Sequence, residues 1–242
     1  MPAPIGDELS AQLDQRFASH VLWHFTGRLN FRENENYNRL VSILGSSLRV
    51  GPKPPAFTYF VPSLTETKTQ LGYPVNCLAD IPFKDLIVHA KRYGRCAIGF
   101  HRNAAIQHGF TPMLYTNQYS PDFQRFMQTR DAIEDLVAQL KDTELSSKID
   151  ELLYYLGSIA KAGLLDMAPR SDDQFDAEDP KNNYYYEREW RSIREWNFSA
   201  EAVAAVMLPG HMLEKFAEDR KARNLKVTAQ TAIIPFDMIW RF

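Results

Sequence analysis

The sequence predicts an α+β fold, with a mixed sheet, flanking helices and one inserted helical hairpin. Two observations favour this fold. Short apolar strands alternate with short helices up to residue 116, and a longer amphipathic helical pattern then interrupts them. Parallel doubly wound folds are less favoured, because neither GxGxxG nor GxxxxGK[ST] occurs in the chain. We expect a single domain over residues 1–242.

The first half of the chain gives the alternating elements. Leu9, Leu13 and Phe17 recur at helical spacing, and "HVLWHFTG" follows as a strand closed by glycine. Residues 37–47 form the next predicted helix, and residues 51–74, which begin with "GPKPP", read as loop. The elements expected after it are a strand at "PVNCLADIP", a helix at "FKDLIVHAKRYG", a strand at "CAIGF", a helix at "RNAAIQHG" and a strand at "TPMLYT".

The inserted hairpin is expected at about residues 121–168. Its apolar residues fit two amphipathic helices separated by "KDTELSSK", which is rich in capping residues. An acidic loop follows at about residues 171–181, either as a passive solvated segment or as a lid. A strand at "AVAAVMLP", a helix at 211–223 and a strand at "VTAQTAIIPF" complete the chain.

Composition excludes several classes of protein. The 28 basic and 30 acidic side chains give a net charge of −2, so the chain as a whole does not attract nucleic acid or an anionic membrane. Cys77 and Cys96 are too few for a disulfide framework and lack the spacing of a metal site. With no long apolar run and no basic-then-apolar leader, we expect a cytoplasmic protein without a membrane segment.

The stretch "NNYYYEREWRSI" at residues 182–193 holds an unusual density of aromatic and charged residues. Read as a strand, it places Glu187, Glu189 and Arg191 on one face. One interpretation is a solvent-facing surface with cross-strand ion pairs. The other is a site for glycosyl chemistry, in which one carboxylate stabilises an oxocarbenium-like transition state and the other orients the acceptor.

Histidines in "HVLWHFTG" raise the question of a metal. His20 and His24 are four residues apart, but the position after His20 is valine, where a zinc hydrolase helix would carry its general-base glutamate. We therefore expect no metal. A hydrogen-bonded core histidine is the plain alternative for His24.

The motifs "LWHFTG", "PVNCLADIP", "HAKRYGRCAIGF", "GFTPMLY" and "YYYEREWR" occur in this order over residues 21–195. Together they resemble the AbiGi-type abortive phage resistance family, with leucine and alanine at 78 and 79 in place of the aromatic part of one motif. The resemblance implies a role in phage defence or in a toxin–antitoxin pair, because members have been described as antitoxins as well as resistance proteins.

A more distant likeness, in motif order alone, is to the ADP-ribosyltransferase fold, including toxins that modify nucleic acids. It implies NAD as substrate, modification of a nucleic acid or protein, and a ribose contact from His24. Either Tyr115 or Tyr93 would stack on nicotinamide, and Thr26 and Gly27 would add contacts to the cofactor. Glu189 would bind the nicotinamide ribose and Glu187 would orient the acceptor. The alternative is a catalytically silent antitoxin or sensor that acts by binding another protein of the defence system.

Overall fold

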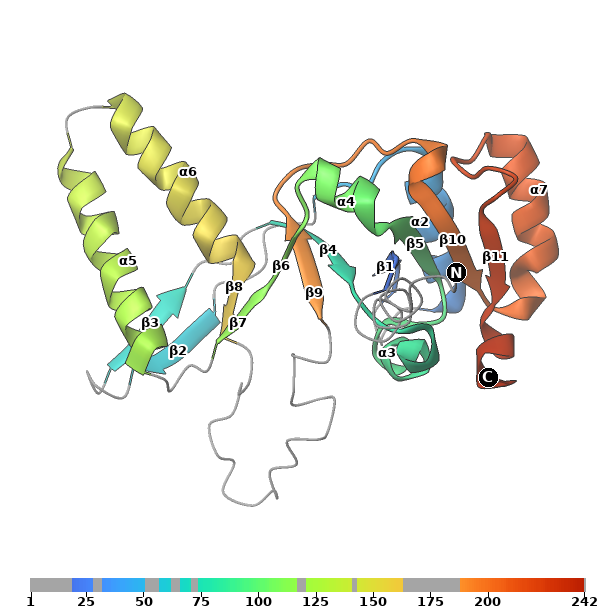
Figure 1. The fold of residues 1–242 in the computed structure, drawn as a ribbon, viewed down its shortest axis with the longest axis horizontal. Helices are drawn as coiled ribbons and strands as arrows, with labels where there is room; N and C mark the ends of the chain where they lie inside the picture. The colour runs from blue at the N-terminus through green and yellow to red at the C-terminus, as the bar shows by residue number, and fades with distance from the viewer. Residues whose placement is uncertain are drawn as a thin grey trace, which may run out of the picture. The chain divides into compact units, whose positions relative to one another are not determined.

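The computed structural model describes residues 19–27, 32–50, 57–61, 66–70, 74–116, 121–140, 143–162 and 188–241 (Figure 1). Backbone contacts divide the chain into two compact units. Unit 1 comprises Met1–Arg49, Cys77–Phe110 and Glu195–Phe242, and unit 2 comprises Val50–Asn76 and Thr111–Arg194. A compact unit assembled from interleaved segments is not by itself an independently folding domain. The single domain over residues 1–242 therefore stays a prediction.

The sheet of unit 1 has the strand order β11-β10-β5-β1-β4. Antiparallel pairs join β4 to β1, β1 to β5 and β5 to β10, whereas β10 and β11 are parallel. The sheet is therefore mixed, as the sequence predicted. The five strands are β1 (Val21–Phe25), β4 (Asn76–Ala79), β5 (Ala97–His101), β10 (Val203–Leu208) and β11 (Ala232–Pro235).

A glycine at the centre of β5 permits the close pairing of β1 with β5. Gly99 lies opposite Trp23 in the antiparallel register. A Cβ atom at position 99 would lie 2.6 Å from Val21 Cγ1 and 3.0 Å from the Trp23 ring. Such contacts are closer than packed atoms tolerate, so the absent side chain makes room for the indole on this face of the sheet.

Helices pack against the sheet of unit 1 through apolar residues. Trp23 faces a buried cluster that includes Leu86 and Ala90 of α3. Leu22 points to the opposite face, because side chains alternate along a strand. The Tyr37 hydroxyl of α2 donates to Asp219 Oδ2 of α7 at 2.7 Å. The helical elements of unit 1 are α2 (Glu33–Gly45), η1 (Phe83–Asp85), α3 (Leu86–Tyr93), α4 (Arg102–His108), η3 (Ala200–Ala202), η4 (Gly210–Met212), α7 (Leu213–Arg223) and η5 (Phe236–Arg241).

Unit 2 contains short strand pairs and a helical hairpin. An antiparallel pair joins β6 to β9, a parallel pair joins β7 to β8, and β2 and β3 form an antiparallel hairpin. Two helices, α5 and α6, lie side by side within the range expected for the helical insertion (Figure 1). The elements are β2 (Phe57–Val61), β3 (Glu66–Gln70), β6 (Thr111–Pro112), β7 (Leu114–Thr116), α5 (Pro121–Gln139), α6 (Thr143–Ile159), β8 (Ala160–Ala162) and β9 (Glu189–Ser192).

The prediction of a loop over residues 51–74 was wrong, because β2 and β3 lie within that range. The prolines of "GPKPP" precede the hairpin, and "FTYFV" is rich in the aromatic and β-branched residues that favour strands. The predicted acidic loop at 171–181 lies outside the described residues. Within the described part of the chain, every helix is too short or too polar to span a bilayer.

Candidate functional site

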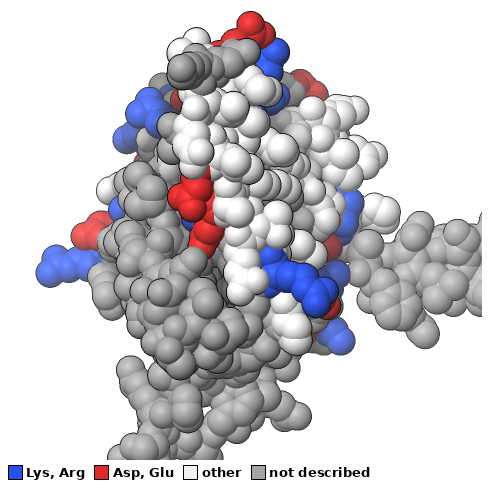
Figure 2. Space-filling view, turned by 90° about the vertical axis from the view of Figure 1, so that its left-hand side faces the viewer, with Lys and Arg blue, Asp and Glu red and all other residues white. Residues whose placement is uncertain are grey.

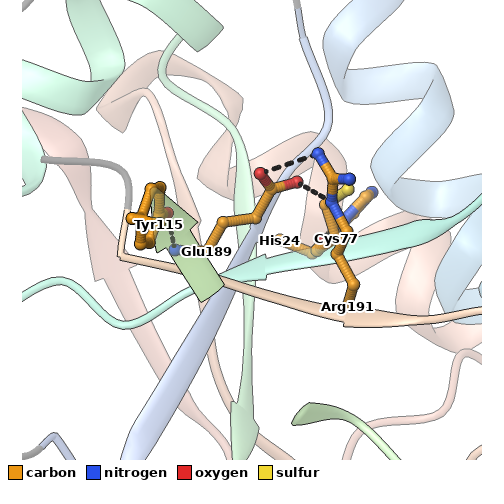
Figure 3. A network of polar contacts seen from close by, with 5 residues as sticks. All are labelled: His24, Cys77, Tyr115, Glu189 and Arg191. Atoms are coloured by element: carbon orange, nitrogen blue, oxygen red, sulfur yellow. Dashed lines mark hydrogen bonds and ion pairs between the residues drawn. The ribbon is translucent and has the colours of Figure 1, made fainter. Parts of the chain in front are cut away.

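The glutamate of the "EREWR" motif forms a two-point ion pair. Arg191 Nε lies 3.0 Å from Glu189 Oε1, and Arg191 Nη2 lies 3.1 Å from Oε2 (Figure 3). The two residues share one face of β9 because they are two positions apart. Glu189 is only 7% exposed, and the planar guanidinium matches both carboxylate oxygens. The buried Glu189 carboxylate is therefore paired with a cation at both oxygens, and such pairing offsets the cost of burying a charge.

The main chain of Glu189 is held by the segment that follows β6. Its N–H donates to the Tyr115 hydroxyl at 2.6 Å (Figure 3). Its carbonyl oxygen accepts from the N–H of Met113 at 2.8 Å. The residue before it, Arg188, has a positive φ of 40°, a strained conformation for a residue with a side chain. The Tyr115 hydroxyl thus fixes the strand that carries Glu189.

His24 lies on β1 in unit 1, where Nδ1 is 2.9 Å from the carbonyl oxygen of Cys77 (Figure 3). A carbonyl can only accept, so Nδ1 carries the hydrogen and the neutral ring keeps Nε2 as an acceptor. Burial lowers the pKa of His24 below its ordinary value, and the bond to Cys77 offsets this only in part. A neutral imidazole of this tautomer can accept a hydrogen bond from a hydroxyl group.

The residues after His24 join the ends of β1, α2 and α3. The Thr26 hydroxyl lies 2.8 Å from the carbonyl of Asn36 and 3.2 Å from that of Cys96. A Cβ atom at Gly27 would lie 2.4 Å from the Tyr93 carbonyl oxygen and 2.5 Å from the Asn36 side-chain nitrogen. Both residues therefore allow protein segments to pack closely.

Tyr93 lies with two other aromatic rings on the far side of β1 from His24. Its ring centre is 4.6 Å from that of His89 and 6.4 Å from that of Phe25. Phe25 follows His24 in the strand and so points to the opposite face. The structure therefore does not bring Tyr93 and His24 together on one face of β1.

The predicted site residues thus fall into two groups. His24, Thr26, Gly27 and Tyr93 belong to unit 1, whereas Tyr115 and Glu189 belong to unit 2 and are in direct contact. Glu187, the predicted acceptor-orienting residue, lies outside the described residues.

The predicted NAD site can be compared with these contacts. Nε2 of His24 suits a ribose hydroxyl, since it is a hydrogen-bond acceptor. The Thr26 hydroxyl, the Tyr115 hydroxyl and the Glu189 carboxylate, by contrast, are all engaged by protein groups. NAD as substrate therefore stays a prediction. The described residues contain no group of three His, Cys, Asp or Glu side chains suited to a metal ion.

Neither Arg191 nor Asp80 was predicted as a site residue from the sequence. Arg191 binds the motif glutamate, and its signal was its position two residues after Glu189 on the same strand face. Asp80 of the "LADIP" motif is buried, accepts from the N–H of Ser19 at 3.3 Å and pairs with Arg102 at 2.8 Å. No spacing rule links Asp80 with Arg102, because the fold alone brings them together.

Most of these motifs lie within the residues that match a family of phage-resistance proteins. The model of the family described as abortive phage resistance protein AbiGi, antitoxin, matches residues 57–229, more than two thirds of the chain. The chain belongs to this family, and the predicted resemblance is confirmed. None of the curated proteins and none of the solved structures matches it.

Proposed function

We propose that this protein is a cytoplasmic antitoxin of a phage-defence system, and that it acts by binding a partner protein rather than by turning over a substrate. The family description, which includes the word antitoxin, supports this function. The observation that carries the binding mechanism is the state of Glu189. Its carboxylate is buried and both oxygens are bound by Arg191, so the glutamate serves the fold of unit 2.

The energetics agree with a structural role for this pair. A carboxylate whose charge is already balanced by a fixed guanidinium gives less stabilisation to a positive charge that develops in a transition state. Removing Glu189 from Arg191 would leave two charges that are both mostly shielded from water, at a cost of several kcal/mol. A silent member of the family has no need to disrupt the pair.

An antitoxin is needed only where its toxin is present. Depleting this protein from cells that naturally carry it should therefore arrest their growth, and re-expression from a plasmid should restore growth. A matched strain that lacks the whole defence system should grow normally without the protein. Undiminished growth of the depleted natural strain would contradict the antitoxin function.

An NAD-dependent ADP-ribosyltransferase is the second candidate, and the tautomer of His24 favours it. The Nε2 acceptor is the contact that the resemblance assigns to a ribose hydroxyl. In this alternative, NAD is consumed and a nucleic acid or protein is modified.

Incubating the protein with labelled NAD and extract of its own cells tests the second candidate. Label transferred to RNA, DNA or protein by the wild type, and lost in Glu189→Gln, would establish the transferase and replace the binding mechanism. We expect neither transfer nor release of free ADP-ribose above a protein-free control.

A further inference from the structure

We draw no further inference here: the strongest candidate, the set of exposed leucines (Leu136, Leu145 and Leu152) on the α5–α6 hairpin of unit 2, the part of the chain turned toward the viewer in Figure 2, carries no proposal because nothing in the described part of the structure shows what covers these side chains.

Discussion

Arg191 binds both carboxylate oxygens of Glu189 on one face of β9, at 3.0 and 3.1 Å. The glutamate that was expected to act as a catalytic carboxylate is thus paired with an arginine of the same motif inside unit 2. Because of this pair, we expect the "EREWR" motif to stabilise the fold of unit 2. Measurements of the free energy of unfolding test this expectation.

Removing the arginine should destabilise the protein. Arg191→Met leaves the Glu189 carboxylate buried without its charge partner, which should cost about 2 kcal/mol after allowance for the partial exposure of Arg191. Urea unfolding followed by tryptophan fluorescence measures the change. The matched control is Lys148→Met, which breaks an exposed pair and should cost less than about 0.5 kcal/mol. Equal effects of the two substitutions would show that the Glu189 pair is unimportant to the fold.

Tyr115→Phe should release the main chain of Glu189. The substitution keeps the ring but removes the oxygen that accepts from the Glu189 N–H, at a cost of about 1 kcal/mol. Hydrogen exchange of the Glu189 amide should accelerate about fivefold. Tyr154→Phe, which removes a hydroxyl bond to the Pro74 carbonyl elsewhere in unit 2, should leave that amide unchanged. No acceleration in Tyr115→Phe would contradict the role assigned to its hydroxyl.

Gly27 should not tolerate a methyl group. In Gly27→Ala the new Cβ would meet the Tyr93 carbonyl oxygen at 2.4 Å, so β1, α2 and α3 would have to separate, at about 2–3 kcal/mol. Gly45→Ala is the control, because its nearest neighbour would be a Leu225 carbon at 3.7 Å and alanine favours the helix. Thermal denaturation should show a lower Tm only for Gly27→Ala, and a tolerated alanine there would mean that the three segments can separate freely.

Burial of His24 should make the protein less stable as the pH decreases. Burial lowers the folded-state pKa of this histidine from the ordinary value of 6.5, so below that pH the unfolded chain binds the proton more readily. The unfolding free energy therefore decreases as pH falls from about 6.5 toward the folded pKa, and above 6.5 this group contributes no slope. Urea midpoints measured at several pH values should lose this component in His24→Gln. They should keep it in His101→Gln, whose imidazole is exposed. An identical slope in wild type and His24→Gln would contradict the assignment.

Much of the fold could be predicted because local pattern and tertiary structure agree. Val21–Phe25, Ala97–His101 and the two helices of the hairpin follow their apolar periodicity. The helix expected at residue 37 begins at Glu33, since the polar run "ENEN" has no apolar stripe to reveal a helical first turn. The hairpin of β2 and β3 was missed because the loop predicted at the preceding prolines was continued through the residues that form these two strands.

The candidate site was less predictable, because pairing of distant residues depends on the fold. The alternation of side chains along a strand predicted that Glu189 and Arg191 share one face, and the structure confirms this. Nothing in the sequence indicated that the Tyr115 hydroxyl would meet the Glu189 main chain, 74 residues away. The positions of His24 and Tyr93 on opposite faces of β1 likewise arise from the packing of α3. The ADP-ribosyltransferase likeness in motif order stays a prediction.

The most direct test of the central claim is the growth of depleted cells that express a variant with uncharged residues in place of Glu189 and Arg191. Glu189→Gln combined with Arg191→Gln removes both charges together, so it avoids a lone buried charge while abolishing any carboxylate chemistry at position 189. The account predicts that the double variant restores growth as well as the wild type, since binding to the partner needs the fold and not the carboxylate. A double variant that is folded, with an unchanged circular dichroism spectrum, yet fails to restore growth would contradict it.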